Sequence, residues 1–162
     1  GAYAQWSAQK PVNKASVVYD TMWKSTEKMA HALAESMNRE GVPTRLLHLR
    51  ANDRSDVMTE VFDSGIVAIG SPTLNNGMFP TVADFLCYMK GLKPKNKIGA
   101  AFGSYGWSGE AANLVHKEME DAGFLMADAA LRAMFVPGAD AIEACYALGV
   151  KLAQNLKQKI AS

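Results

Sequence analysis

The fold is decided by the stretch Ala15-Ser16-Val17-Val18-Tyr19-Asp20-Thr21-Met22-Trp23-Lys24-Ser25-Thr26. Its first five residues are largely apolar and β-branched, a pattern that predicts a buried strand. From Ser25 onward the pattern is helical, because apolar residues return at spacings of three and four, at Met29, Ala30, Leu33, Ala34 and Met37. A buried strand, a polar loop and an amphipathic helix form the repeating unit of α/β proteins.

The same order returns along the rest of the chain. Further strands are expected over 44–49, 64–70, 97–102 and within 124–135, and further helices over 54–62, 81–89, 110–121 and from about 139 to 160. The segment 54–62 reads as a short polar helix or a loop, and Gly41, Gly91 and Gly123 are expected to end the helices before them. The alternation predicts a three-layer α/β/α sandwich with a five-stranded parallel sheet.

Composition describes an ordinary globular domain. The chain has 162 residues, of which 49% are hydrophobic and 20% charged, and its net charge is +1, so we expect neither a membrane segment nor a nucleic-acid partner. Cys87 and Cys145 stand in no metal or redox spacing and read as reduced core thiols of a cytoplasmic protein. Residues 1–13 lack periodicity and read as a linker from a missing upstream domain, which leaves 14–162 as the folded domain.

The first loop has the chemistry of a phosphate site. Thr21, Ser25 and Thr26 supply three hydroxyl groups where a helix begins, and the first N–H groups of a helix attract anions. Lys24 adds a positive charge. A simple Ser/Thr helix cap explains part of the pattern equally well. The loop lacks both the Gly-Lys-Ser/Thr ending of a nucleotide P-loop and the Gly-x-Gly-x-x-Gly dinucleotide pattern.

Two later loops suit a flat aromatic ligand. The loop 71–77 carries Leu74 beside Asn75-Asn76-Gly77, and the loop 103–109 carries Tyr105 and Trp107 among glycines. Trp107 packed on a neighbouring loop, and Asn-Gly as a plain turn, are the alternatives. All three loops follow predicted strands, and loops at the carboxyl ends of parallel strands form a common ligand crevice. A phosphate at one end and a planar ring at the other predict flavin mononucleotide (FMN).

The three loops resemble those of flavodoxins, whose phosphate loop reads Thr-x-Thr-Gly-x-Thr. They resemble more closely the C-terminal flavodoxin-like domain of flavodiiron proteins (A-type flavoproteins, including rubredoxin:oxygen oxidoreductase). The motifs Tyr-Asp-Ser/Thr-Met-Trp-x-Ser-Thr-Glu-x-Met, Gly-Ser-Pro-Thr-x-Asn and Phe-Gly-Ser-Tyr-Gly-Trp-Ser-Gly-Glu-Ala stand here at 19–29, 70–75 and 102–111.

The resemblance implies a flavodoxin-like sheet of order 2-1-3-4-5 that binds FMN through residues of the three loops. These are Thr21, Met22, Trp23, Lys24, Ser25, Thr26, Pro72, Thr73, Leu74, Asn75, Asn76, Gly77, Ser104, Tyr105, Gly106, Trp107 and Gly109. Two features depart from ordinary flavodoxins: Lys24 replaces a loop glycine, and the chain is nearly neutral instead of acidic.

The resemblance also implies a function for the parent protein. A donor such as rubredoxin or a rubredoxin-like reductase would pass electrons through FMN to a diiron site that reduces oxygen or nitric oxide. That site belongs to an N-terminal metallo-β-lactamase-like domain of a homo-oligomeric parent. Its His-x-Glu-x-Asp-His ligand motif is absent from this chain, and His31, His48 and His116 have no ligand spacing, so we expect neither a metal site nor a catalytic residue here.

Two other functions are compatible with the pattern, and a third shares only the fold. A free-standing flavodoxin would carry electrons between separate proteins. A flavodoxin-like NAD(P)H:quinone reductase would turn over without a protein partner. A phosphoacceptor receiver domain needs an aspartate at the end of the third strand, where this chain has Gly70-Ser71.

Overall fold

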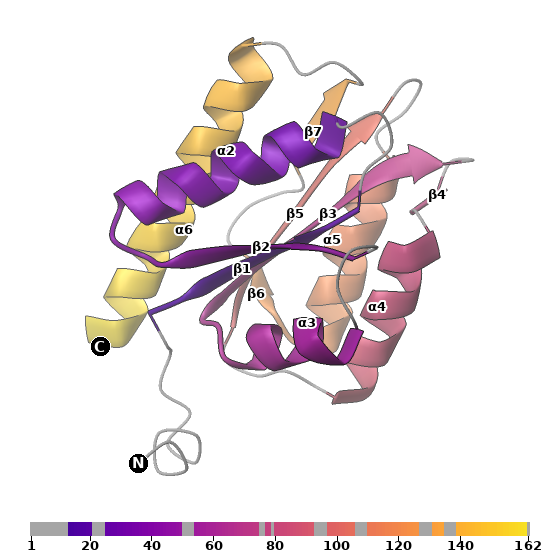
Figure 1. Cartoon of the computed structure of the whole chain (residues 1–162), viewed down its shortest axis with the longest axis horizontal. Helices are drawn as coiled ribbons and strands as arrows, with labels where there is room; N and C mark the ends of the chain where they lie inside the picture. Colours follow the sequence, from indigo (N-terminus) through magenta and orange to yellow (C-terminus); the bar gives the residue numbers. More distant parts are fainter. Residues whose placement is uncertain are drawn as a thin grey trace.

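The structure is a computed structural model of the whole chain. It describes residues 13–20, 25–49, 54–74, 77–78, 80–92, 97–105, 110–126, 131–134 and 139–161. Within these residues, one sheet lies between two layers of helices (Figure 1). The predicted linker lies outside the described residues except for Asn13, so its assignment remains a prediction.

The sheet has the predicted strand order. Its parallel strands are β1 (Ala15–Tyr19), β2 (Thr44–His48), β3 (Ile66–Leu74), β5 (Ile98–Tyr105), β6 (Leu125–Met126) and β7 (Leu131–Met134). They run in the order β2-β1-β3-β5-β6, and β7 also pairs with β5 in parallel. Because β3 occupies one side of β5, β6 and β7 are two parts of the fifth strand on its other side. The order 2-1-3-4-5 is confirmed.

The helices divide between the two faces of the sheet. One face is covered by α2 (Ser25–Arg39) and α6 (Ala139–Ala161), and the other by α3 (Arg54–Phe62), α4 (Pro80–Leu92) and α5 (Glu110–Ala122). Neighbouring residues of β1 enter different cores: Val17 packs with α2 and α6, whereas Val18 packs with α3, α4 and α5. This alternation follows from the period of two in a strand, and burial on both faces explains why the strand is largely apolar.

Several element boundaries differ from the sequence prediction. The strands β3 and β5 continue to Leu74 and Tyr105, and α4 continues through Gly91 to Leu92 instead of ending there. Residues 54–62 form a helix rather than a loop. The ends of α2 and α5 are confirmed, because Gly41 and Gly123 follow them with φ of 88° and 107°, a conformation that favours glycine.

The extension of β5 has a physical reason at Gly103. A Cβ atom on this residue would lie 2.4 Å from the carbonyl oxygen of Ser71 in the adjacent strand. Glycine here lets two strands approach closely and does not mark a turn. A glycine in the sequence can therefore indicate either a turn or a close approach of two strands. The close approach at Gly103 lies near the edge of the sheet where β3 and β5 end.

The two cysteines have different environments. Cys145 is buried in α6, and burial raises the pKa of its thiol to about 12. Cys87 is exposed on α4, so its prediction as a core thiol was wrong. The buried face of α4 is made by Val82, Phe85, Leu86 and Met89, whose spacing leaves position 87 on the outer side. Both cysteines are free.

A short antiparallel element at the end of β3 was not predicted. The strand β4 (Gly77–Met78) folds back on β3, with Leu74 opposite Gly77 and Thr73 opposite Met78. The helix α4 begins two residues later, at Pro80. The chain therefore turns back at the carboxyl edge of the sheet before it enters the helix.

Candidate cofactor site

The carboxyl ends of β1, β3 and β5 lie side by side at one edge of the sheet (Figure 1). Tyr19 at the end of β1 is level with Gly70 of β3, and Pro72 of β3 is level with Ser104 of β5. The chain leaves β1 toward α2 and β2 on one side, whereas β3 and β5 lie on the other. The described ends of the strands that precede the three predicted loops therefore meet at one topological switch point, the usual ligand crevice of such sheets.

The predicted site residues fall into three groups. Ser25 and Thr26 open α2, and Thr26 is fully buried. Several others belong to strands: Pro72, Thr73 and Leu74 end β3, Gly77 begins β4, and Ser104 and Tyr105 end β5. The rest lie outside the described residues: Thr21, Met22, Trp23, Lys24, Asn75, Asn76, Gly106, Trp107 and Gly109.

The start of α2 suits an anion. The helix has 15 residues and begins at Ser25, six residues after β1 ends at Tyr19 on the carboxyl edge. The first N–H groups of a helix have no partner within it and carry the positive end of its dipole. A phosphate placed there gains hydrogen bonds and a favourable charge interaction. The described part of the first loop therefore fits the phosphate end of FMN.

A buried carboxylate lies directly beside this loop. Asp20 follows β1, is 0% exposed, and donates its backbone N–H to the carbonyl of Gly70 (3.3 Å). Its Oδ1 lies 2.9 Å from Nε2 of His48, and its Oδ2 accepts a hydrogen bond from the hydroxyl of Thr81. An ionised Asp20 only accepts hydrogen bonds, so in the tautomer that pairs with it Nε2 of His48 carries the hydrogen.

Tyr19 extends this arrangement to α2. Its ring stacks on that of His48, with centroids 5.0 Å apart and planes 12° apart, and its hydroxyl donates to Glu27 (3.2 Å). Burial, together with Glu27 and Asp20, raises the pKa of Tyr19 to about 12. Together with Asp20 and Thr81 these residues form what we call the edge network: Tyr19, Asp20, Glu27, His48 and Thr81.

Sequence reasoning missed the edge network. His48 read as a scattered histidine, and Asp20 only as the first residue of a loop. Asp20 lies 28 residues from His48 and 61 from Thr81, so the contacts arise only when β2 and α4 take their places. One available signal was the position of His48 near the end of the second predicted strand, 44–49, which pairs with the first.

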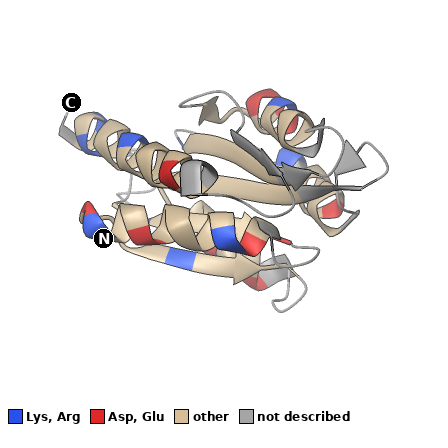
Figure 2. Ribbon diagram, turned by 90° about the horizontal axis from the view of Figure 1, so that it is seen from above, with Lys and Arg blue, Asp and Glu red and all other residues tan. Residues whose placement is uncertain are grey.

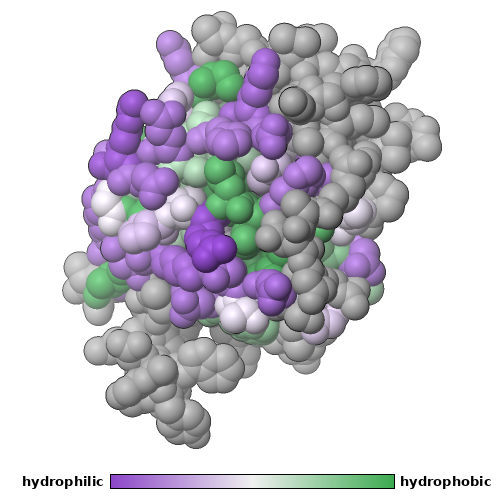
Figure 3. All heavy atoms as spheres, viewed as in Figure 1, coloured by the Kyte–Doolittle hydropathy of each residue, from purple (hydrophilic) through white to green (hydrophobic). Residues whose placement is uncertain are grey.

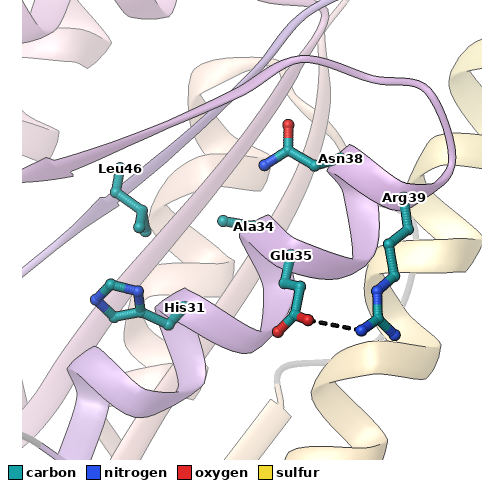
Figure 4. Close-up of a pocket in the computed structure, with 6 residues that line it drawn as sticks. All are labelled: His31, Ala34, Glu35, Asn38, Arg39 and Leu46. Carbon is teal, nitrogen blue, oxygen red and sulfur yellow. Dashed lines mark hydrogen bonds and ion pairs between the residues drawn. The ribbon is translucent and has the colours of Figure 1, made fainter.

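A separate groove lies between α2 and the edge strand β2. It has a volume of about 480 Å³ and is lined by His31, Ala34, Glu35, Asn38, Arg39 and Leu46 (Figure 4). Arg39 pairs with Glu35 (2.7 Å) and lies over the ring of Tyr146 in α6, and the Asn38 side chain accepts the N–H of Thr44. Its polar side chains thus hold α2 against its neighbours, and we assign no ligand to it.

Other kinds of site find no support in the described residues. Both acidic and basic residues occur on their helices (Figure 2), and the surface that carries β2 is mostly hydrophilic with small apolar areas (Figure 3). Among them, no group of three or more His, Cys, Asp and Glu side chains is placed to hold a metal ion. None of their helices combines the length and hydrophobicity that crossing a bilayer requires.

Comparison with known proteins agrees with this geometry. Residues 17–149 match the flavodoxin family. The chain is 44% identical over 160 residues to the rubredoxin-oxygen oxidoreductase of Megalodesulfovibrio gigas, covering 99% of this chain and 40% of that protein. It is 42% identical over 156 residues to the nitric oxide reductase of Moorella thermoacetica, covering 96% and 39%. The chain thus spans about two fifths of the length of these relatives.

Solved structures resemble the chain as closely. The rubredoxin oxygen:oxidoreductase from Desulfovibrio gigas matches with a TM-score of 0.95 and 44% identity, over 99% of this chain and 40% of that one. A flavodoxin from the domain Archaea matches with a TM-score of 0.81 and 31% identity, over 89% of this chain and 99% of that one. The chain thus matches part of the larger oxidoreductase, whereas it matches nearly the whole length of the archaeal flavodoxin.

Proposed function

Since the chain belongs to the flavodoxin family, and corresponds within it to the flavodoxin-like part of flavodiiron proteins, we propose that it carries FMN in the crevice between its three loops and serves in electron transfer. FMN supplies one- and two-electron redox chemistry at its ring. The observation that carries the proposal is the meeting of three strand ends, with Tyr19 level with Gly70 and Pro72 level with Ser104.

The two ends of FMN are assigned to different loops. We place the phosphate at the start of α2, where Thr21, Ser25 and Thr26 supply hydroxyl groups and the helix supplies N–H groups. We place the ring between Leu74 and the pair Tyr105 and Trp107, because Leu74 ends β3 and Tyr105 ends the adjacent β5. The remaining predicted residues complete the walls of the crevice.

The role of the parent protein follows from the relatives. Their names point to rubredoxin as donor and to oxygen or nitric oxide as acceptor, and this chain spans only about two fifths of their length. We propose that residues 1–13 link this domain to a diiron metallo-β-lactamase-like domain in a cytoplasmic homo-oligomer. In that arrangement this domain passes electrons from rubredoxin, or a rubredoxin-like reductase, toward the iron site.

The cofactor assignment can be tested directly. The purified chain, stripped of flavin and mixed with FMN, FAD or riboflavin, should take up one FMN per chain and prefer it to the other two. We expect a preference over FAD because the first loop suits a terminal phosphate group. The sequence also has no second nucleotide-binding fingerprint for the adenosine half of FAD. Recovery of FAD, or uptake of no flavin at all, would refute the proposal.

A free-standing flavodoxin is the second candidate. It is favoured by the archaeal flavodoxin, which this chain matches over 99% of that protein's length. Electron-transfer rates separate the two functions: a relay of the flavodiiron type should accept electrons rapidly from reduced rubredoxin. If the FMN-loaded chain reacts with ferredoxin-type donors and not with rubredoxin, the flavodoxin function is the better one. Sustained NAD(P)H oxidation with a quinone alone would instead indicate a quinone reductase.

A further inference from the structure

We propose that Asp20 is a positioning residue for the phosphate loop, held in place by His48 and Thr81 so that the crevice favours a phosphorylated flavin. The inference rests on the proposed function, because it assigns a role in recognising the phosphate of FMN. Asp20 precedes residues 21–24 of that loop and is 0% exposed.

The first step is the cost of burying Asp20. A carboxylate removed from water is unfavourable unless hydrogen-bond donors replace the water. Two donors in the structure come from different elements, Nε2 of His48 at the end of β2 (2.9 Å) and the hydroxyl of Thr81 in α4. The backbone N–H of Asp20 is also bonded, to Gly70 of β3. Three elements thus fix the point where the chain leaves β1.

The second step is that the other end of the loop is fixed by the same network. Glu27, in the first turn of α2, accepts the hydroxyl of Tyr19, and the ring of Tyr19 stacks on His48. The network therefore holds the described positions on either side of residues 21–24, Asp20 before them and Glu27 after them. An anchored loop loses less conformational freedom when a phosphate binds, and such preorganisation strengthens binding.

The third step is the sign of the charge. An acidic side chain beside a phosphate loop repels the ligand, so its charge does not explain its presence there. Its burial and its bonds to His48 and Thr81 point to a positional role that outweighs the repulsion. The two effects predict opposite results for Asp20→Asn, which keeps the size of the side chain and removes its charge.

The experiment compares FMN with riboflavin, which has the same ring and no phosphate. Dissociation constants for both are measured by flavin fluorescence on the flavin-free chain and on Asp20→Asn, His48→Phe, His48→Gln and Asp121→Asn. His48→Phe keeps an aromatic ring against Tyr19 and removes the donor to Asp20, whereas His48→Gln keeps a donor. Asp121 is an exposed carboxylate on α5 and serves as the matched control.

We expect Asp20→Asn and His48→Phe each to weaken FMN binding about tenfold, the effect of losing a hydrogen bond to a charged group. Riboflavin binding should change less than about twofold. His48→Gln should recover part of the affinity for FMN, and Asp121→Asn should leave both constants unchanged. Far-UV circular dichroism and urea unfolding of each flavin-free variant confirm that it is folded before its constants are compared.

Three results would overturn the inference. Equal weakening of FMN and riboflavin would show a general structural role, and unchanged FMN binding would show no role. Tighter FMN binding by Asp20→Asn would show that repulsion of the phosphate is the larger effect. Failure of the unaltered chain to bind any flavin would refute the proposed function itself, which is a distinguishable outcome.

Discussion

The charged residues next to the strands have opposite signs at the two edges of the sheet. At the amino edge, lysines precede strands: Lys14 precedes β1 and bonds Glu60 (2.5 Å) and Asp63 (3.0 Å), and Lys97 precedes β5. Lys97 is nearly buried and donates to the carbonyls of Phe62 (2.8 Å) and Ser64 (2.6 Å). At the carboxyl edge, the buried charge is the carboxylate of Asp20, bonded to His48 and Thr81.

This difference in charge suggests that the amino edge contributes to stability and the carboxyl edge to ligand binding. At the amino edge both lysines hold the last turn of α3 and the residues after it, where carbonyl groups without helical partners and the negative end of the helix dipole favour positive charge. At the carboxyl edge the charge has the same sign as a phosphate, and its partners come from elements that flank the loops. We therefore expect substitutions at the amino edge to change stability, and substitutions at the carboxyl edge to change flavin binding as well.

The largest effect is expected from Gly103→Ala. The new Cβ would lie 2.4 Å from the backbone oxygen of Ser71, and neither strand can move away without breaking the β3–β5 pairing. Overpacking against backbone in a core strand should cost about 3 kcal/mol of unfolding free energy, measured by urea denaturation.

Gly99→Ala is the matched control on the same strand at the amino edge. There the Cβ would meet the flexible side chains of Met126 (2.9 Å) and Met119 (3.0 Å), which can move, although Phe124 is also close. We expect a cost of about 1 kcal/mol and unchanged FMN affinity, whereas Gly103→Ala should also weaken FMN binding. Equal costs at both glycines would show that the backbone contact at Ser71 is not decisive.

Local sequence patterns predict helices and strands well, but they do not predict contacts between distant residues. The apolar, β-branched run of β1 and the apolar helix positions from Met29 to Met37 identify a buried strand and a helix with a buried face from local sequence alone. The need for glycine at position 103 arises from the Ser71 carbonyl, 32 residues earlier in the chain. Sequence patterns therefore predicted a loop where β5 continues to Tyr105. The same holds for the site: the hydroxyl-rich start of α2 is a local pattern, but the edge network joins residues that meet only through folding.

Lys97→Met is expected to have the next largest effect. It keeps the apolar stem and removes the donors to Phe62 and Ser64, so two carbonyls lose their partners at a cost of about 2 kcal/mol at pH 7. FMN affinity should be unchanged in the folded variant. Loss of FMN affinity comparable to that of a carboxyl-edge variant would contradict the separation of the two edges.

The same variant has a pH dependence of defined sign. Burial lowers the pKa of Lys97 to about 8, against the opposing charge of Asp63. Between that value and its ordinary pKa the unfolded chain binds more protons than the folded one, so Lys97 makes the chain more stable as pH rises through this window. The stability advantage over Lys97→Met should therefore widen from pH 8 to about 10.4, and a narrowing gap would contradict this.

A smaller effect is expected from Trp107→Ala at the carboxyl edge. If Trp107 stacks on the flavin ring, its loss should weaken FMN and riboflavin binding alike by about 1 kcal/mol, or roughly fivefold. This equal loss distinguishes a ring contact from the phosphate-specific effect expected of Asp20. Fluorescence titration with both flavins measures it, and unchanged affinity for both would place Trp107 away from the ring.

The smallest effect is expected from Lys14→Met, and its pH dependence should be opposite to that of Lys97→Met. Burial by itself lowers the pKa of Lys14, but hydrogen bonds to Glu60 and Asp63 and the charges of these groups raise it overall. Because the folded pKa lies above the unfolded one, the stabilisation is complete below about pH 10.4 and is lost as pH rises through the folded value. Asp63 is largely exposed, so the ion pairs should contribute less than about 1 kcal/mol. Urea unfolding from pH 8 to 11.5, with Lys117→Met at an exposed position of α5 as control, should show the Lys14 stability gap constant to about pH 10.4 and then closing. If it widens as the Lys97 gap does, burial and not pairing controls both lysines, and the amino edge is not held by its ion pairs.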